Sequence, residues 1–253
     1  MSKYMKITDF MRIFSSERRI EVLDALLRQE SKDEIKRHIP SSTYAFTVNY
    51  LKKVGFVREA DGEVSLTDRG HTNLIIFERF KESISALHML YEAFPDHAIV
   101  FPNEFALRLC EIGDARVIAS EPSDILKPHR IFTDYLKNTR EIYGVSPILF
   151  PDYPEFFRSL AESVDTISIV VTQEVFDIIS TYPLDNYDNL EIYLTSEAPG
   201  IAATVTDTFL SIGFFYKSGS YDFTRDLIAT SPAAIKFGKD LIQHYRTQSR
   251  RIV

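Results

Sequence analysis

The stretch that decides the fold is residues 41–70, SSTYAFTVNYLKKVGFVREADGEVSLTDRG. Its first half has the pattern of a helix of roughly three turns, because the apolar side chains of Tyr44, Val48 and Leu51 recur on one face. A serine at position 41 or 42 can cap the first turn by accepting a hydrogen bond from a free backbone N–H. Gly55 favours the end of this helix, since glycine tolerates the left-handed backbone found there.

The second half of the stretch predicts a tight hairpin. Residues 56–59 and 63–66 flank the dipeptide Asp61-Gly62. Asp-Gly is a strong hairpin signal because a type I′ turn needs a positive φ at both central residues. Residues 66–70 then lead into another helix. A helix, a hairpin and a following helix in this order are the plan of a winged helix.

Two further helices are expected before this stretch. The first covers about residues 15–27, where Ile20, Leu23 and Leu26 follow helical spacing. The second opens with a capping box, Ser31 with Glu34 three residues later, and Pro40 ends it. Residues 1–70 are therefore predicted to be a helix-turn-helix inside a three-helix core, finished by a wing.

The charge of the chain is unevenly distributed. The whole chain carries a formal charge of −7, which argues against nucleic-acid binding. Residues 1–72, however, hold 13 Lys and Arg against 11 Asp and Glu, a net charge of +2, which leaves −9 for the remainder. Within residues 31–58 the net charge is +4. A local basic stripe of this kind is what phosphate binding needs, although a solvated helix face is the plain structural alternative.

In a winged helix the third helix enters the major groove of double-stranded DNA. If Tyr44, Val48 and Leu51 point inward, the outer face is expected to carry hydroxyl and aromatic side chains, namely Ser42, Thr43, Phe46, Thr47 and Tyr50. The basic residues expected at the DNA are Lys36, Arg37, Lys52, Lys53 and Arg58. A structural alternative for Phe46 is that it plugs the core beside the second helix. The acidic tip of the wing, with Glu59, Asp61 and Glu63, disfavours insertion into a minor groove.

Residues 71–94 form the longest periodic segment. Two series of apolar residues repeat every seven positions and interleave as heptad positions a and d: Phe77, Ile84 and Tyr91, and Phe80, Leu87 and Phe94. Since helix-turn-helix proteins commonly bind two half-sites as dimers, residues 71–95 are predicted to be a linking helix that holds a homodimer. The alternative is a long helix packed on its own C-terminal domain.

Residues 96–253 are predicted to be a mixed α/β domain. The expected strands are 115–119, 146–150, 166–171, 190–194, 201–206 and 209–216, the last followed by a hairpin at 217–220. The expected helices are 128–142, 154–162, 173–180 and 232–251. Alternation of strands and helices at this spacing is typical of α/β architecture.

Four segments of this domain carry a family signature: VSPI at 145–148, TISIVVT at 166–172, VTD at 205–207, and the tail 219–249 with Tyr221-Asp222, Ala234-Ile235 and His244-Tyr245-Arg246. Together with the layout, they resemble the archaeal winged-helix regulators of the methanogenesis regulatory protein family. The C-terminal half is more distantly similar to TrmB-type sugar regulators, which have a phospholipase D-like fold. The resemblance implies a DNA-binding transcription regulator and carries over no ligand or operator.

No catalytic motif accompanies this fold. Phospholipase D-type chemistry needs a histidine nucleophile with a lysine two residues later, but His129 is followed by Arg130-Ile131 and His244 by Tyr245-Arg246. The chain also lacks Gly-x-Gly-x-x-Gly and Gly-x-Ser-x-Gly, and its six histidines show no metal spacing. We therefore expect no enzyme, no cofactor and no metal. The alternative function is an α/β scaffold or catalytic protein whose winged helix mediates protein–protein contact.

A small-molecule effector site is predicted at the C-terminal ends of the expected strands, because open α/β sheets bind ligands there. The side chains at these ends are Glu121, Asp152, Thr172, Gln173 and Glu197. The helix start at Thr172 favours an anion, whereas the acidic residues favour a cation or a polyhydroxylated molecule, so the ligand class stays open. The alternative is that these residues are only polar loop positions.

The cellular compartment follows from what the chain lacks. The lone Cys110 excludes an intramolecular disulfide and indicates a reducing compartment. No apolar run approaches the ~20 residues that span a bilayer, and the N-terminus has no signal-peptide core. We therefore expect a cytoplasmic protein without membrane association.

Overall fold

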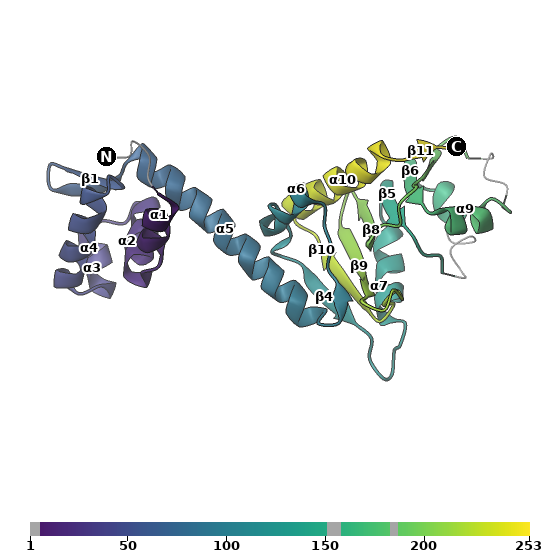
Figure 1. The fold of residues 1–253 in the computed structure, drawn as a ribbon, viewed down its shortest axis with the longest axis horizontal. Helices are drawn as coiled ribbons and strands as arrows, with labels where there is room; N and C mark the ends of the chain where they lie inside the picture. Colours follow the sequence, from purple (N-terminus) through teal and green to yellow (C-terminus); the bar gives the residue numbers. More distant parts are fainter. Residues whose placement is uncertain (1–5, 151–157, 183–186) are drawn as a thin grey trace. The chain divides into compact units, whose positions relative to one another are not determined.

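Figure 1 shows the computed structural model of the chain, which describes residues 6–150, 158–182 and 187–253. The chain divides into two compact units, Met1–Lys81 and Glu82–Val253, called here the N-terminal and the C-terminal unit. Within the described ranges, no helix is long and apolar enough to cross a membrane.

The N-terminal unit consists of helices followed by a hairpin. Its elements are α1 (Ile7–Phe14), α2 (Glu17–Leu27), α3 (Lys32–His38), α4 (Ser41–Lys53), β1 (Val57–Ala60), β2 (Glu63–Leu66) and the first turns of α5 (Asp68–Ala93). The predicted helices, the capping box of Ser31 and Glu34, and the hairpin are all confirmed. Helix α1 is an addition to the predicted elements, and it buries Ile13 and Phe14.

The turn between β1 and β2 has the predicted geometry. Ala60 pairs with Glu63, and the two residues between them, Asp61 and Gly62, have φ values of 54° and 81°. Both are positive, as a type I′ turn requires. The register of the hairpin is therefore set by this dipeptide.

The core of the N-terminal unit is built around aromatic side chains. Phe14 stacks on Phe77 of α5 with ring centroids 4.2 Å apart, and it lies 6.0 Å from the buried ring of Phe56. Tyr44, Val48 and Leu51 of α4 are buried in the same core, as predicted. Residues from α1, α4 and α5 thus share one core.

A close approach of backbone fixes the start of α5. Thr67 donates its hydroxyl to the carbonyl of Gly55 at 2.7 Å and accepts a hydrogen bond from the N–H of Gly70 at 3.0 Å. A Cβ atom placed on Gly70 would lie 1.9 Å from the carbonyl oxygen of Phe56. Only glycine fits at this position, so α5 begins in direct contact with the strand that enters the hairpin.

Helix α5 contributes to both cores. Leu74 and Phe77 near its N-terminal end are buried in the core of the N-terminal unit. Ala86 and Leu90 at its other end, and Phe94 directly after the helix, are buried in the core of the C-terminal unit. The predicted long helix is therefore confirmed, and its two ends are each anchored by apolar burial.

The C-terminal unit is organised around a nine-stranded mixed sheet, ordered β11-β7-β6-β5-β8-β9-β10-β4 with β3 paired to β9. Its strands are β3 (His97–Ala98), β4 (Arg116–Ala119), β5 (Glu141–Ser146), β6 (Thr166–Val171), β7 (Leu190–Leu194), β8 (Ile201–Thr206), β9 (Leu210–Tyr216), β10 (Arg225–Ala229) and β11 (Arg250–Arg251). Strands β5, β6 and β7 are parallel, and the remaining pairs are antiparallel. The predicted mixed architecture is therefore confirmed.

Helices cover the two faces of this sheet. They are α6 (Asn103–Ala106), the 3-10 helix η1 (Leu109–Ile112), α7 (Lys127–Leu136), α9 (Gln173–Ile179) and α10 (Pro232–Thr247). Helix α10 covers one face and α7 the other (Figure 1). Phe237 and Leu241 of α10 and Phe132 and Leu136 of α7 are the buried residues that pack on the sheet. Alternate residues of each central strand therefore face one helix or the other.

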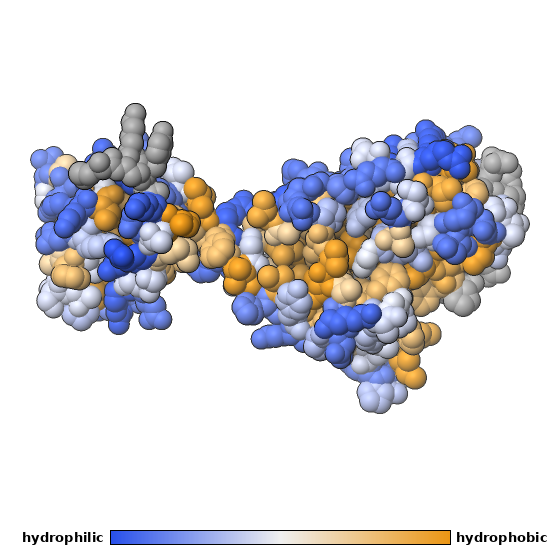
Figure 2. Space-filling model, in the orientation of Figure 1, coloured by the Kyte–Doolittle hydropathy of each residue, from blue (hydrophilic) through white to orange (hydrophobic). Residues whose placement is uncertain are grey.

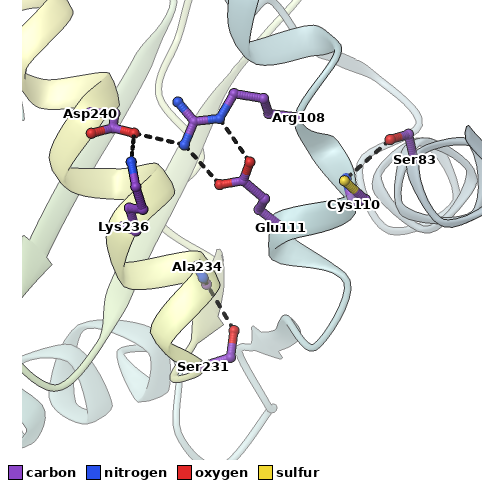
Figure 3. Close-up of polar contacts among 8 residues, drawn as sticks. All are labelled: Ser83, Arg108, Cys110, Glu111, Ser231, Ala234, Lys236 and Asp240. Carbon is purple, nitrogen blue, oxygen red and sulfur yellow. Dashed lines mark hydrogen bonds and ion pairs between the residues drawn. The ribbon is translucent and has the colours of Figure 1, made fainter. Parts of the chain in front are cut away.

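Polar contacts hold the segment around η1 against α10 and α5 (Figure 3). Arg108 donates to Glu111 and forms an ion pair with Asp240 at 2.7 Å. Asp240 is also paired with Lys236 at 2.6 Å, and the N–H of Cys110 donates to Ser83 of α5 at 3.3 Å. The half-buried guanidinium of Arg108 thus connects two elements that are distant in sequence.

Two predicted elements between residues 128 and 150 are wrong in their bounds. The helix ends at Leu136 rather than at residue 142, and the next strand is β5, Glu141–Ser146, rather than 146–150. Helical spacing continues past the true end of α7, but Ile142 and Val145 are buried within the sheet. Strand β10 was not predicted at all, because Arg225 and Asp226 open it with two charged residues.

The other predicted strands are confirmed to within one residue, including β4, β6, β7, β8 and β9. Thr172 caps α9 as predicted, accepting a hydrogen bond from Val175 N–H. Residues 158–161 are helical, and the rest of the helix predicted at 154–162 lies mostly outside the described residues.

Candidate nucleic-acid interface

The solvent-facing side of α4 is the candidate interface. Its exposed residues recur at helical spacing: Ser41, Ser42, Ala45, Phe46, Asn49, Lys52 and Lys53. Phe46 is 71% exposed, so the alternative that it plugs the core is wrong. Phe46 therefore offers an apolar side chain on the otherwise mostly polar outer face of α4.

One predicted contact residue lies on the wrong side of the helix. Thr47 is only 3% exposed and belongs to the inward stripe with Tyr44, Val48 and Leu51. The stripe therefore contains a polar residue that its hydrophobic spacing did not reveal. Thr47 cannot reach a DNA base while α4 keeps this orientation.

Two further predicted residues flank the outer face. Thr43 and Tyr50 are half-buried, and the guanidinium of Arg19 lies over the ring of Tyr50 at 4.0 Å from its centroid. The contact with α2 holds the ring of Tyr50 in place. These residues border the exposed face rather than form its centre.

The prediction missed Asn49. This side chain is exposed on α4. It lies seven positions after Ser42 and four before Lys53, so the same helical spacing that defines the face would have found it. An asparagine side chain can form two hydrogen bonds with an adenine, one through its amide oxygen and one through its amide nitrogen.

The basic residues near α4 differ in their surroundings. Lys52 forms an ion pair with Glu59 of β1 at 2.5 Å, and this hydrogen bond holds the pKa of Glu59 below its ordinary value. The Lys36 ammonium lies 5.8 Å from the ring centroid of Tyr44. Lys53 has no ion pair within the described part of the chain, and Arg37 is exposed. Of the two lysines in the last turn of α4, Lys53 is therefore the one without an ion pair to another described residue.

The hairpin presents both signs of charge. Arg58 is exposed and its Nε donates to Ser65 at 3.3 Å. Glu59, Asp61 and Glu63 are exposed as well, which keeps the tip acidic. The hairpin therefore carries an exposed cation at Arg58 and an acidic tip.

The predicted dimer residues of α5 fall into two groups. Phe77 and Phe94 are buried in the two cores, and Leu87 packs partly on the core of the C-terminal unit. Phe80, Ile84 and Tyr91 are 49%, 40% and 52% exposed. Phe77 and Phe94 thus support the alternative of internal packing, while the other three remain available to a partner.

The predicted effector residues do not form one site. Strand β4, which precedes Glu121, lies at the opposite end of the sheet order from β6 and β7, which precede Thr172 and Glu197. Glu121 is paired with Lys127, and Gln173 donates to Asp177 at 2.6 Å. Asp152 lies outside the described residues. The predicted rim is therefore not a single pocket.

Comparison with known proteins finds a family model and a relative that are similar to parts of this chain. Residues 125–248 match the family model described as Methanogenesis regulatory protein FilR1, middle domain. The Methanogenesis regulatory protein FilR1 of Methanothrix harundinacea (strain 6Ac) is 22% identical over 198 residues, which are 74% of this chain and 44% of that relative. These two matches confirm the resemblance to the methanogenesis regulatory protein family. The chain spans less than half the length of that relative.

Two solved structures are also similar. One is TrmBL2, described as an archaeal chromatin protein with a novel mode of DNA binding, with 12% identity, a TM-score of 0.45, and coverage of 96% of this chain and 100% of that one. The other is an IclR transcriptional regulator from Alicyclobacillus acidocaldarius, with 12% identity, a TM-score of 0.25, and coverage of 97% and 99%.

Proposed function

We propose that this chain is a cytoplasmic, sequence-specific DNA-binding transcription regulator whose N-terminal unit is a winged helix. The observation that carries the proposal is the exposed face of α4, on which Phe46, Asn49 and Lys53 project from a helix that follows α3 across a tight corner. A major groove accommodates one α-helix, and this face offers an apolar, an amide and a cationic side chain to it.

The roles of these side chains follow from their chemistry. Asn49 reads an adenine through two hydrogen bonds, and Phe46 packs on a thymine methyl group. Lys53, Arg37 and Arg58 bind phosphates and fix the register of the helix on the duplex. The similarity to a methanogenesis regulatory protein supports a regulatory function. The phospholipase D-like assignment of the C-terminal unit remains part of this proposal, without a catalytic role.

A gel-shift assay with the chain's own upstream DNA, at two salt concentrations, tests the proposal. We expect a specific complex that weakens as salt rises, because each phosphate contact releases counterions. An absence of any shift at low salt would favour the alternative of an α/β scaffold or catalytic protein whose winged helix contacts another protein.

Asn49→Ala and Lys53→Ala should weaken DNA binding in different ways. Asn49→Ala should lower affinity for the preferred site about tenfold or more and relax the preference for adenine at one position, since a bidentate base contact contributes ~1–3 kcal/mol of discrimination. Lys53→Ala should weaken binding equally on all sequences and reduce the salt slope by about one. Fluorescence anisotropy on a panel of operator variants measures both effects.

Two matched variants control this experiment. Thr47→Ser should leave the base preference unchanged, since Thr47 is buried, and Lys137→Ala removes an exposed lysine of the C-terminal unit. If Asn49→Ala keeps the wild-type preference at every position, α4 does not read the bases.

We further propose that α5 holds two copies of the chain together. Ile76, Phe80, Ile84 and Tyr91 are exposed and fall on one side of the helix. Figure 2 shows hydrophobic residues along α5, mixed with hydrophilic ones. A stripe of this spacing is suited to pack against its own copy, which would place two α4 helices on two half-sites.

Replacing Phe80 and Ile84 together by glutamine should shift the protein from dimer to monomer in multi-angle light scattering. The same change should weaken operator binding, since the two half-sites are no longer bound by one particle. Ile178→Gln, which alters a 50% exposed apolar residue of α9, is the matched control and should change neither property. A double variant that stays dimeric would place the dimer contact elsewhere.

A further inference from the structure

A cavity of about 60 Å³ lies between α7 and the sheet of the C-terminal unit and opens to solvent. Strands β5, β6, β8, β9 and β10 contribute to it, together with α7 and residues 221–223. All of these elements belong to the segment 125–248 that matches the family model. The cavity is separate from the strand-end residues predicted from the sequence.

The cavity exists because small side chains occupy one area of the sheet face. Gly144 of β5 pairs with Thr204 of β8, which pairs with Ser211 of β9. These three residues form a row on the face that elsewhere carries Ile142 and Phe209. A helix packed on a sheet normally fills such positions with large apolar residues, so the row leaves a hollow under α7.

Asp226 of β10 lies in the wall of this hollow. It is 7% exposed, and its Oδ2 accepts a hydrogen bond from Ser211 Oγ at 2.7 Å. Its Oδ1 is buried and has no hydrogen-bond partner in the described part of the chain. Burial raises the pKa of Asp226 to about 7, against the hydrogen bonds from Ser211 and Leu227, which lower it. A buried acceptor without a donor is costly to the fold, and it points to a group that is supplied from outside.

The remaining walls indicate the kind of molecule that fits. Phe132, Ile148 and Ile169 provide apolar contact. Arg225 also lines the cavity, but its guanidinium donates to the carbonyl of Ala93 at 3.2 Å. The mainly apolar walls favour a neutral ligand. The buried part of that ligand is smaller than benzene, since a cavity of about 150 Å³ is what holds benzene.

We propose that this cavity is an effector site for a small, neutral, mainly apolar molecule whose single O–H or N–H group donates a hydrogen bond to Asp226 Oδ1. The apolar part of the molecule lies against Phe132, Ile148 and Ile169, and the rest extends toward solvent. Such a ligand satisfies a buried acceptor in the cavity wall for which the described residues supply no donor.

Two isomers of the same composition, 1-butanol and diethyl ether, test this site because only the alcohol has a donor. The isotope-labelled full chain is titrated with each at pH 8, where the Asp226 carboxyl is mainly ionised and can only accept. We expect saturable shifts of the amide signals of Gly144, Thr204 and Ser211. We expect the alcohol to bind about tenfold more tightly than the ether, which corresponds to one hydrogen bond to a charged group.

Three variants test whether the preference for the alcohol arises at Asp226 in the cavity. Asp226→Asn should reduce the preference for the alcohol to within about twofold, because an amide can donate as well as accept. Ala202→Leu, which places a larger side chain in the cavity wall, should abolish binding of both isomers. Asp165→Asn changes an exposed carboxylate of the same unit and should keep the wild-type preference.

Equal binding of the two isomers to the wild-type chain, or no saturable shift at the three amides, overturns the proposal. Unchanged alcohol binding in Ala202→Leu overturns it as well. If either cavity variant fails to fold, the isomer comparison on the wild-type chain decides alone. The measurement contains no DNA, so its result is independent of the gel-shift assay that tests the proposed function.

Discussion

Gly70→Ala should unfold the N-terminal unit locally and remove DNA binding with it. The added methyl group would lie 1.9 Å from the carbonyl oxygen and 2.7 Å from the carbonyl carbon of Phe56. Neither group can move away freely, because the same carbonyl accepts a hydrogen bond from Thr67 N–H at 2.9 Å. Phe56 itself is fully buried in the core.

The cost should exceed about 3 kcal/mol, the upper part of the range for overpacked sites. Hydrogen exchange of the full chain, followed by mass spectrometry, measures it directly. Peptides from residues 41–66 should exchange more than about 100-fold faster, since 1.4 kcal/mol corresponds to a factor of ten. Peptides from the sheet of the C-terminal unit should keep their protection.

Gly62→Ala is the matched control in the hairpin. Gly62 has a φ of 81°, but a Cβ atom there would meet no atom within 4 Å. Its cost should therefore be only the ~1–2 kcal/mol of a left-handed alanine. If residues 41–66 keep wild-type protection from exchange in Gly70→Ala, the close contact with Phe56 does not determine the stability of the N-terminal unit.

Most of the N-terminal unit could be predicted because its signals are local. The capping box at Ser31, the stripe through Leu51 and the Asp61-Gly62 turn each act within a few residues, and all three are confirmed. The long helix over residues 68–93 was also predicted, from apolar residues that recur every seven positions. Local signals of this kind persist in the fold because they agree with its tertiary packing.

The parts that failed depend on tertiary contacts. Helix α7 ends where it does because β5 must join β6 in the sheet. No residue near Leu136 signals this end in the sequence. Strand β10 could not be predicted because its charged residues have hydrogen-bond partners far away in the sequence. Arg225 donates to the carbonyl of Ala93, and Asp226 accepts from Ser211. Single-sequence patterns cannot show such pairs.

The candidate interface was predicted only in part, because part of it also depends on tertiary contacts. Helical spacing places Ser42, Phe46 and Lys53 on the outer face of α4. The rotation of the helix, however, is set by how it packs on α2 and the hairpin, and it buries Thr47 while exposing Asn49. The local sequence does not show whether a polar residue at the edge of an apolar stripe faces the core or the solvent.

Asp226→Asn should stabilise the C-terminal unit by about 3 kcal/mol at pH 8. The pKa of Asp226 rises from 3.8 to about 7 on folding because burial disfavours the charged carboxylate. A rise of this size corresponds to at most about 4 kcal/mol of stability lost at alkaline pH. The asparagine amide avoids that loss and can still accept the hydrogen bond from Ser211.

The effect has a defined pH dependence. A folded-state pKa above the unfolded value means that the stability of the neutral carboxyl is fully present below about pH 4 and is lost as the pH rises through about 7. The difference between Asp226→Asn and the wild-type chain should therefore be small at pH 4, grow up to about pH 7, and stay constant above it. Urea unfolding of the full chain across this range measures the difference.

Asp165→Asn separates this effect from the removal of any carboxylate, because Asp165 is exposed and paired with Arg140. It should change stability by less than about 1 kcal/mol at every pH. If Asp226→Asn gains no stability at pH 8, the carboxyl is not held in an unfavourable state. If it does gain stability, the wild-type chain retains a destabilising residue in the wall of a cavity between α7 and the sheet. Proteins retain such residues mainly at functional sites, where a ligand supplies the missing partner.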